Sequence, residues 1–311
     1  NVLNQQINNE EVLEAKHIFA IDYLKLKVEI TNNPLELSQN MVIPLTKFDG
    51  EFQPLQESYS KQWVCGSYND HIQIKAINKN EILIHGNLFK WLNGQNVTGT
   101  TDLIQLVLDT VNRLSQIFNT ITPTDTEIEN IKLGLFRIYR IDVNKALLFD
   151  DKQKAQQYLS SIKEHGTYPR RDREVEKNGI YFGKGSKRTT LLYYFKGQEI
   201  RSHNKQQTTL TTELREYADR MIRCEVRLFN KQLRDSELHY GYCWNEELVK
   251  HLVEDAHSKL NLPEPVSEIE LPAKYIRFLA TQKQGALHIG YTASTTARYK
   301  RDLARDYGLM V

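Results

Sequence analysis

The chain has 311 residues, of which 40% are hydrophobic and 26% are charged, and its formal net charge is +2. This length and composition predict a folded protein with a sizeable core, built as one large domain or two ordinary ones. No apolar run approaches the roughly 20 residues of a membrane-spanning helix, and no signal peptide is visible. We therefore expect no membrane partner.

Three cysteines, Cys65, Cys224 and Cys243, are spread widely along the chain. This pattern gives neither a disulfide framework nor a paired zinc signature, so a reducing cytoplasm is the expected location. The small net charge does not by itself indicate nucleic acid. The basic residues are clustered, however, at 168–173, 184–188 and 298–305, and clusters of one sign favour a polyanionic partner.

The first clear strand is predicted at residues 19–30, where polar and apolar side chains alternate. Alternation puts Asp22 on the same face as Leu24 and Leu26. Asp22 can be read as an active-site carboxylate, or as a residue bonded to the backbone where the strand starts. Shorter strands are predicted near 62–67, 71–77 and 81–86, and His85 on the last of them is a weak candidate metal ligand.

Residues 86–99 are predicted to form a polar, glycine-rich loop. Its Lys90, Gln95 and Asn96 could contact a DNA backbone or base edges, or could simply belong to a compact surface loop. The rest of the chain is predicted to contain a helix at 101–119 capped by Thr101, a strand at 132–143, a helix at 151–165, a hairpin ending at 196, a polar linker at 201–208, a helix at 211–218, a strand at 221–229 and a helix at 245–260.

Together these elements predict an α+β protein: an antiparallel sheet flanked by helices, with a helical C-terminal appendage. Two strand–helix–strand blocks, at about 18–143 and 179–260, suggest a divergent duplication. The expected domains are a catalytic unit at 18–262 and a small helical unit at 266–311.

Candidate chemistry lies on the second strand of the hairpin, predicted at 189–196. Alternation places Tyr194 and Lys196 on one face and Tyr193 on the other. A phenol with a lysine two residues on is a sensible pair for attack on a phosphate. The cation can lower the pKa of the phenol and neutralise charge on a phosphoryl oxygen. Taken alone, the same pattern also describes an amphipathic strand whose tyrosines pack.

Two other predicted strands carry a carboxylate between cations. Arg140 and Asp142 share a face in one, and Glu225 shares a face with its flanking arginines Arg223 and Arg227 in the other. If these strands neighbour that of Tyr194, one face of the sheet collects all of these groups. Facing carboxylates repel unless a cation lies between them, and their oxygens suit Mg²⁺ or Mn²⁺. The alternative to a metal site is a solvent-exposed sheet face on which the charges pair across neighbouring strands.

Four motifs, in this order, carry a resemblance to a known family. They are Lys90-Trp-Leu-Asn-Gly-Gln-Asn-Val-Thr-Gly99, Arg140-Ile-Asp142, the segment at 191–199 and Arg223-Cys-Glu-Val-Arg227. The first resembles the K-x-L-x-G-H-N-V-x-G signature of the replication initiators of filamentous phages, the gene II protein family with its phage X relatives. The pattern is also similar to plasmid rolling-circle initiators of the replication-transactivator type.

The resemblance implies a DNA nickase and strand transferase that acts at an origin of rolling-circle replication. Tyr194 matches the family tyrosine, which joins the 5′-phosphate and frees a 3′-OH for priming. Arg140, Arg223 and Lys196 would hold phosphate oxygens, and Asp142 and Glu225 would bind Mg²⁺ or Mn²⁺. The implied partners are single-stranded or supercoiled origin DNA, a host helicase and polymerase, and a second copy of the chain, all in a bacterial cytoplasm.

The chain departs from the family pattern in one respect that concerns metal binding. Gln95 replaces the histidine of the signature, and the sequence holds no His-hydrophobic-His pair. This departure concerns the identity of the metal ligands more than the assignment of Tyr194 as the family tyrosine. Two other functions fit the same residues: a non-catalytic origin-binding protein or repressor, and a metal-dependent nuclease that activates water.

The C-terminal segment is predicted to hold a helix from Ala273 to about Lys283 and a second helix after Thr292. The second helix opens with hydroxyl residues and carries cations along its length, namely Arg298, Lys300, Arg301 and Arg305. Such a pair suits a helix-turn-helix reader of the major groove. It also resembles the tail of the phage X-type initiators. A basic helix that caps the fold is the competing interpretation.

Overall fold

The computed structural model describes residues 19–39, 42–45, 56–66, 68, 70–203, 210–262, 271–283, 285 and 287–307. The chain divides into two compact units, with the boundary between Leu262 and Pro263. No helix within these ranges is long and apolar enough to cross a membrane. The sequence of residues 1–16 is polar and acidic and predicts a short helix or an ordered arm. This segment and most of the predicted linker at 201–208 lie outside the described residues.

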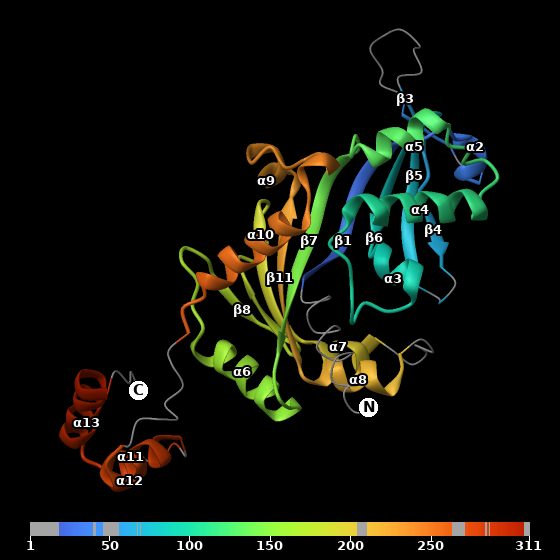
Figure 1. The fold of residues 1–311 in the computed structure, drawn as a ribbon. Coiled ribbons are helices and arrows are strands. Elements are labelled where there is room, and N and C mark those ends of the chain that lie inside the picture. The colour runs from blue at the N-terminus through green and yellow to red at the C-terminus, as the bar shows by residue number, and fades with distance from the viewer. Residues whose placement is uncertain are drawn as a thin grey trace. The chain divides into compact units, whose positions relative to one another are not determined.

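The first unit is built on an antiparallel sheet of nine described strands, in the order β4-β5-β6-β1-β7-β11-β10-β9-β8 (Figure 1). Its strands are β1 (Phe19–Glu29), β4 (Gln62–Cys65), β5 (His71–Asn78), β6 (Glu81–Gly86), β7 (Arg137–Leu148), β8 (Arg173–Val175), β9 (Gly179–Phe182), β10 (Thr189–Phe195) and β11 (Met221–Phe229). A separate two-stranded ribbon is formed by β2 (Val42–Leu45) and β3 (Gln56–Tyr59). The predicted antiparallel α+β fold is confirmed.

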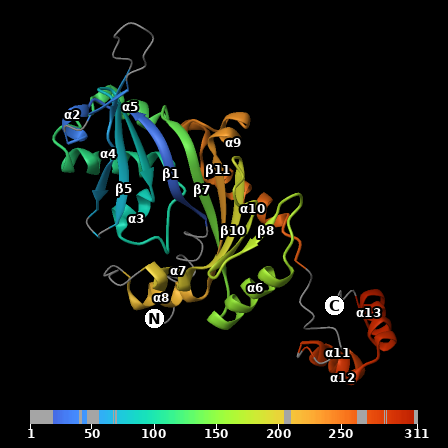
Figure 2. The ribbon, with the colours of Figure 1, turned by 180° about the vertical axis from the view of Figure 1, so that it is seen from behind.

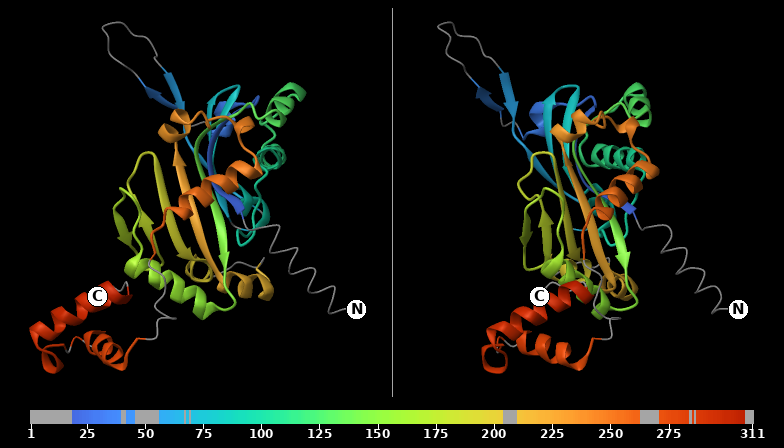
Figure 3. Two further views of the ribbon diagram at one scale, coloured as in Figure 1. Left: turned by 60° about the vertical axis from the view of Figure 1, so that its left-hand side comes forward. Right: turned by 90° about the vertical axis from the view of Figure 1, so that its left-hand side faces the viewer.

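Helices connect and cover these strands. In the first unit they are α2 (Pro34–Leu37), α3 (Leu88–Asn93), α4 (Leu103–Ile117), α5 (Asp125–Lys132), α6 (Lys152–His165), α7 (Lys196–His203), α8 (Thr212–Asp219), α9 (Asn230–Asp235), a 3₁₀ turn η1 (Gly241–Cys243) and α10 (Glu246–Ser258). Helices α4 and α10 lie on the same side of the sheet, as the right-hand view of Figure 3 shows. Their apolar stripes, which include Val107, Leu114 and Val253, join one main core with the strands.

The sheet consists of two halves that follow the same path. In the first half, the meander β4-β5-β6 follows β1 and returns beside it, and α4 comes later in the chain, after α3. In the second half, β7 is followed by a meander whose last strand, β11, returns beside it, and α10 comes later in the chain, after α9 and η1. Strands β1 and β7 pair at the centre. The predicted duplication is thus visible in the topology, although β7 opens the second half and does not close the first.

Polar side chains, among them Tyr194, Glu225 and Asp142, lie on the sheet face opposite α4 and α10, which we call the open face. Figure 2 shows the sheet from that side. Helices α7 and α8 cover only its end, through a small cluster of Val97, Ala146, Ile200, Tyr217 and Met221. On the other face, buried Ile141, Val143 and Cys224 belong to the main core. From Arg140 to Ala146 in β7, and along β11, the side chains alternate between the two faces, so the residues that pack in the core and those that line the pocket lie on opposite faces.

Several local predictions need correction. The predicted loop at 86–99 contains α3, because Asn87 caps it by accepting from the backbone N–H of Lys90, and Trp91 is buried. Helix α4 is capped by Asp102, not by Thr101. Strand β7 starts and ends later than the predicted 132–143, because the preceding residues form α5 with a capping box of Thr124 and Glu127.

The second unit contains α11 (Ala273–Lys283), α12 (Leu287–Gly290) and α13 (Ala293–Tyr307). Tyr275, Phe278 and Leu303 form its small core, with Tyr291 and Tyr299 packed against it. The oxygen of Thr292 accepts from the backbone N–H of Thr295 at 3.2 Å, so the predicted hydroxyl cap of the basic helix is present. The described part of this unit is helical as predicted, and a helix-turn-helix function stays a prediction.

Candidate active site

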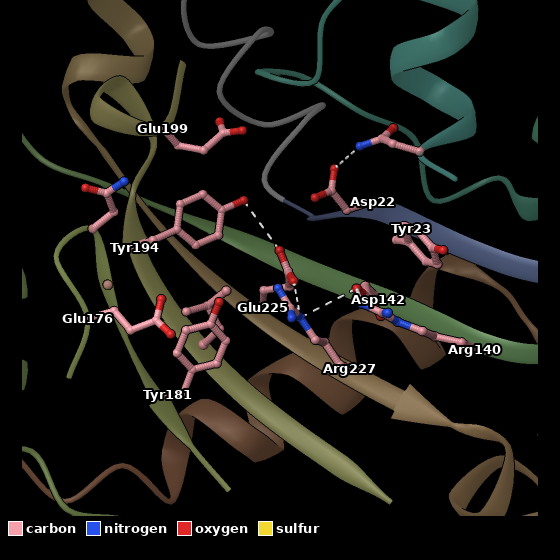
Figure 4. A pocket seen from close by; sticks show the side chains of 14 residues that line it. Asp22, Tyr23, Arg140, Asp142, Glu176, Tyr181, Tyr194, Glu199, Glu225 and Arg227 are labelled. Atoms are coloured by element: carbon pink, nitrogen blue, oxygen red, sulfur yellow. Dashed lines mark hydrogen bonds and ion pairs between the residues drawn. The ribbon is translucent and has the colours of Figure 1, made fainter. Parts of the chain in front are cut away.

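The three strands singled out in the sequence are neighbours, in the order β7-β11-β10. The register places Leu192 opposite Glu225, Tyr194 opposite Arg223, and Arg227 opposite Asp142. Tyr194, Glu225 and Asp142 consequently line one pocket on the open face, together with Arg140, Arg227 and residues of β1 and β9 (Figure 4). The pocket has a volume of about 390 Å³.

Tyr194 is buried in this pocket, and its hydroxyl donates to Oε2 of Glu225 at 3.4 Å. Burial raises the pKa of Tyr194 well above its ordinary value, and the carboxylates of Glu225 and Asp22 add to the rise, while Arg223 opposes it. A nearby cation, Arg223, does lower the pKa of the phenol as expected, but the effect of burial is larger and opposite. The tyrosine is neutral at rest.

Glu225 is the titratable partner of Tyr194. Its Oε1 accepts from Nε of Arg227 at 2.8 Å. Burial, followed by the negative charges of Asp142 and Asp22, raises the pKa of Glu225 to about 7, although Arg227 acts against the shift. Near neutral pH this carboxyl is thus divided between its acid and its base form, as suits a group that takes up and returns a proton.

Asp142 is held by arginines. Nε and Nη2 of Arg140 donate to its two oxygens at 2.8 and 2.6 Å, and Nε of Arg227 lies 3.6 Å from its Oδ2. Burial raises the pKa of Asp142, an effect that Arg140 and Arg227 reduce. The bidentate pair fixes the position of Arg140 beside the pocket.

Tyr193 faces the opposite side of the sheet, as alternation predicts. Its hydroxyl lies 2.8 Å from Nδ1 of His257 on α10, and its ring is fully buried in the main core. Burial raises the pKa of this phenol as well, far beyond the physiological range. Tyr193 is therefore part of the helix–sheet packing, although it is adjacent to Tyr194 in sequence.

Lys196 begins helix α7 and so does not continue strand β10, which ends at Phe195. Its side chain is 0% exposed and donates to Oδ1 of Asn96 at 2.8 Å and to Glu199 at 2.7 Å. Burial, and then the positive charge of Arg223, lower the pKa of Lys196 to about 8. This cation lies behind the pocket and does not line it.

Arg223 is also buried and bonded within the protein. Its Nη2 donates to the backbone oxygens of Asn96 and Val97 at 2.8 and 3.0 Å, and its Nη1 lies 3.7 Å from Asp22. Arg223 and Lys196 thus fasten the segment 94–99 to the sheet.

The three residues of the first motif that were predicted to contact DNA make internal contacts instead. Lys90 pairs with Asp70 at 2.8 Å, and Oε1 of Gln95 accepts from the backbone N–H groups of Val97 and Thr98 at 2.7 and 3.1 Å. Asn96 is nearly buried and joins Lys196 to Asp22. The motif therefore shapes the site from within, and a DNA contact by these residues stays a prediction.

Asp22 lies on the opposite face of the sheet from the one that alternation predicts. Its carboxylate accepts hydrogen bonds from the side chains of Asn87 and Asn96 at 2.6 and 3.1 Å, and not from the backbone at the start of the strand. A bulge between Ile21 and Tyr23 turns Asp22 away from the core face of Leu24. Burial would raise its pKa, but Arg223, Lys196 and the two asparagines outweigh that effect and lower it.

The pocket contains more acids than bases. Asp22, Asp142, Glu176, Glu199 and Glu225 line it, against Arg140 and Arg227. Their oxygens have the chemistry that Mg²⁺ or Mn²⁺ prefers, and the excess negative charge fits a divalent cation. No cluster of three or more His, Cys, Asp or Glu side chains placed to hold a metal is found among the described residues. His85 contacts Tyr23 and Gln73 on the first half of the sheet.

Of the cations on α13, Arg305 pairs with Asp302 and Asp306, and Arg298 lies over the ring of Tyr299 at 5.4 Å. Arg301 is exposed and Lys300 is half-buried. All four belong to the second compact unit, and a role in DNA binding stays a prediction.

Comparison with known proteins identifies the chain's relatives. Residues 20–247 match the model of the family described as the N-terminal part of the phage replication-associated protein, the gene II protein. The replication-associated gene II protein of Enterobacteria phage I2-2 is 23% identical over an alignment of 270 residues that covers 81% of this chain and 78% of that protein. A rolling-circle replication initiator from Geobacillus stearothermophilus aligns over 84% of this chain and 95% of its own, with 10% identity and a TM-score of 0.30.

The family match spans both halves of the sheet and every residue of the pocket described above. The resemblance to phage replication initiators, on which the expectation of a rolling-circle initiator rested, is confirmed. The chain belongs to the family of phage replication-associated proteins of the gene II type.

Proposed function

We propose that this protein initiates rolling-circle replication by cutting one DNA strand at an origin and later rejoining it, with Tyr194 as nucleophile. Membership of the replication-associated family supports an action on replicating DNA. The observation that carries the chemistry is the hydroxyl of Tyr194, held in the pocket at 3.4 Å from Glu225. Among the described residues, Tyr194 is the pocket tyrosine that hydrogen-bonds a carboxyl titrating near neutral pH.

In the proposed reaction, the oxygen of Tyr194 attacks a DNA phosphorus while Oε2 of Glu225 takes the phenolic proton. The new bond joins the tyrosine to the 5′-phosphate, and the bond from phosphorus to the 3′ oxygen breaks. That oxygen takes up a proton and leaves as the 3′-OH that primes synthesis. Rejoining reverses these steps, so the proton on Glu225 returns to Tyr194.

Arg140 and Arg227 are the cations we assign to the phosphate oxygens, because both line the pocket and are about one quarter exposed. Lys196 and Arg223 act as positioning residues. Their buried contacts hold the 94–99 segment and Asp22 against the sheet, which keeps the wall of the pocket in place. This division differs from the expectation that Lys196 and Arg223 touch the phosphate as Arg140 does.

We propose that Glu225 and Asp142 hold Mg²⁺ or Mn²⁺, with Asp22 as a further carboxylate of the same pocket. A bound divalent cation would offset the excess of acids and neutralise charge on the phosphate. Asp142 could bind such an ion only if Arg140 released one of its oxygens, which the phosphate could bring about by competing for the guanidinium. The position of Arg140 would then depend on whether DNA is bound.

The test is covalent capture. The protein is incubated with supercoiled DNA carrying the origin of its own replicon and Mg²⁺ or Mn²⁺, denatured, and examined for a protein–DNA adduct. We expect an adduct with the wild type and with Tyr193→Phe, the matched control from the opposite face, and none with Tyr194→Phe. Nicking without an adduct would assign the site to metal-activated water, and binding without nicking would assign the protein to origin recognition or repression.

A further inference from the structure

The open face of the first half of the sheet carries an unusual exposed residue, Trp63. Its neighbour Val64 belongs to the main core and accepts from the indole of Trp91 at 3.1 Å, so Trp63 points to the opposite face. Trp63 is 68% exposed, whereas the other two tryptophans, Trp91 and Trp244, are 1% and 5% exposed. Trp63 is therefore the tryptophan that a binding partner could reach.

Trp63 starts a row of side chains that crosses five strands in register. Trp63 lies opposite Gln73, Gln73 opposite His85, His85 opposite Lys25, and Lys25 opposite Arg140. We call these five residues the cross-strand row. At a strand spacing of about 4.8 Å the row spans about 19 Å. It leads from the edge strand β4 to the pocket, because Arg140 lines the pocket.

Positive charge surrounds the row. Lys27 and Lys75 lie on the same face, next along β1 and β5, and Glu81 on β6 pairs with Lys27. Three cations lie near His85: burial, and then the charges of Lys25, Lys61 and Arg140, lower its pKa. A polyanion that crosses this face would therefore meet a favourable field.

Aromatic rings accompany the cations at both ends of the row. Beside the pocket, the guanidinium of Arg140 lies 4.3 Å from the ring centre of Tyr23 and 5.4 Å from that of Phe229. At the far end stands Trp63. Cations together with aromatic rings are the arrangement that binds single-stranded nucleic acid, whose phosphates pair with cations and whose unpaired bases stack on rings.

We propose that the cross-strand row binds the single-stranded DNA adjoining the phosphate that Tyr194 cuts, with a base stacked on Trp63. The proposal takes the position of the cut from the proposed function and rests on it to that extent. Binding of the DNA to the row does not depend on the cutting reaction. Single-stranded DNA is favoured over a duplex because the indole can stack only on a base that is free of its partner. The continuity of the row with the pocket sets the path of the strand.

Trp63 provides its own probe, since the other tryptophans are buried. The full chain would be titrated with a short oligo(dT) at low salt while tryptophan emission and its quenching by iodide are followed. We expect the DNA to quench part of the emission and to protect the remainder from iodide. Protection that rises with protein concentration in the absence of DNA would instead make this face an interface between copies, and would overturn the proposal.

Substitutions separate the surface from the catalytic pocket. We expect Trp63→Ala to weaken oligo(dT) binding by about five- to a hundredfold, the range for loss of one stacked base. Lys25→Gln should lower the slope of log affinity against log salt by about 0.7. Lys132→Gln, an exposed lysine on α5 outside the row, is the control and should change neither quantity. Circular dichroism would establish that each variant is folded.

The results also distinguish this proposal from the proposed function. Tyr194→Phe should lose the covalent adduct but keep the quenching of Trp63. If wild-type protein forms no adduct yet shows the quenching, the surface stands and the nicking chemistry fails. Unchanged binding by Trp63→Ala and Lys25→Gln, or equal quenching by a duplex of the same length, would overturn the proposal while leaving the adduct test unaffected.

Discussion

The hydroxyl of Tyr194 donates to Oε2 of Glu225 at 3.4 Å, although both side chains are buried and belong to different strands. Their common burial raises both pKa values, that of Tyr194 far above its ordinary value and that of Glu225 to about 7. Above about pH 7 the pair therefore holds a single proton, which stays on the phenol until phosphate and cations offset the developing charge. The proposed reaction depends on which form Glu225 adopts.

The rate of adduct formation should rise with pH and level off at or below about 7, because only ionised Glu225 accepts the phenolic proton and a divalent cation on its carboxylate would lower the pKa from about 7. Glu225→Gln should remove this rise and slow the reaction by about 10² to 10⁴. Single-turnover rates on an origin oligonucleotide between about pH 5.5 and 8.5, the range that brackets the titration, would measure both. Glu254→Gln, which changes a carboxylate on α10 that pairs with Lys145, is the control. A rise that survives in Glu225→Gln would exclude Glu225 as the proton acceptor.

The same substitution has a predicted effect on stability. The pKa of Glu225 is higher in the folded chain, about 7, than its ordinary 4.5, so the folded state binds this proton more tightly. Its contribution to stability is complete below about pH 4.5 and is lost as pH rises through 7. Relative to wild type, Glu225→Gln should gain on the order of 3 kcal/mol in unfolding free energy at about pH 8 and much less at about pH 5. Urea unfolding at both pH values tests this, and an equal change at each would contradict it.

Sequence periodicity was sufficient to find the strands of the site and their polar face. The runs around Asp142, Tyr194 and Glu225 alternate so regularly that each face could be assigned residue by residue, and the structure keeps those faces. The order of β7, β11 and β10 could not be read in this way. It depends on pairings between residues far apart in the chain, which only the packed structure settles.

Where the alternation pattern predicted the wrong face or the wrong element, a bulge or an earlier strand end had interrupted the strand. One extra residue in β1 moved Asp22 from the core face to the pocket, and no residue type at that position signals a bulge. Lys196 was placed on the strand because a lysine at that spacing fits the pattern, yet it starts a helix and is fully buried. Charged side chains are rarely fully buried unless they are paired. The partners of Lys196, which are Asn96 and Glu199, cannot be identified from the sequence, so its burial could not be predicted.

We expect Asn96 to contribute to the stability of the folded protein. Its side chain accepts from Lys196 and donates to Asp22, so Asn96→Ala leaves a buried cation and a carboxylate each short of one partner. We expect a loss of about 1–3 kcal/mol in unfolding free energy, measured by urea denaturation. Asn93→Ala in the same segment removes an exposed amide and is the matched control. Equal effects of the two substitutions would mean that Asn96 does not hold the site together.

Binding of Mn²⁺ to the chain with a short single-stranded oligonucleotide present, compared with binding to the oligonucleotide alone, tests the metal proposal without reference to activity, because the phosphate is expected to free an oxygen of Asp142 from Arg140. Loss of a supporting group near a metal commonly costs about ten- to a hundredfold in affinity, so loss of a ligand should cost at least about tenfold. We expect this for Glu225→Gln and Asp142→Asn in calorimetry or electron paramagnetic resonance titrations. Asp255→Asn, an exposed carboxylate paired with Lys259 on α10, should have no effect. If all three variants bind Mn²⁺ like wild type, the ion is held elsewhere.

The basic helix α13 yields a prediction from two arginines that differ in their partners. Arg305 is engaged by Asp302 and Asp306, whereas Arg301 is exposed and forms no ion pair with the residues that the structure describes. If α13 contacts a duplex origin, Arg301→Gln should reduce the salt slope of duplex binding by about 0.9, the value for one phosphate contact. Arg305→Gln should reduce it less, because the carboxylates already neutralise that cation. Fluorescence anisotropy at several salt concentrations would compare them. A larger effect of Arg305 would mean that DNA displaces the aspartates, and no effect of either would leave α13 outside the DNA-binding surface.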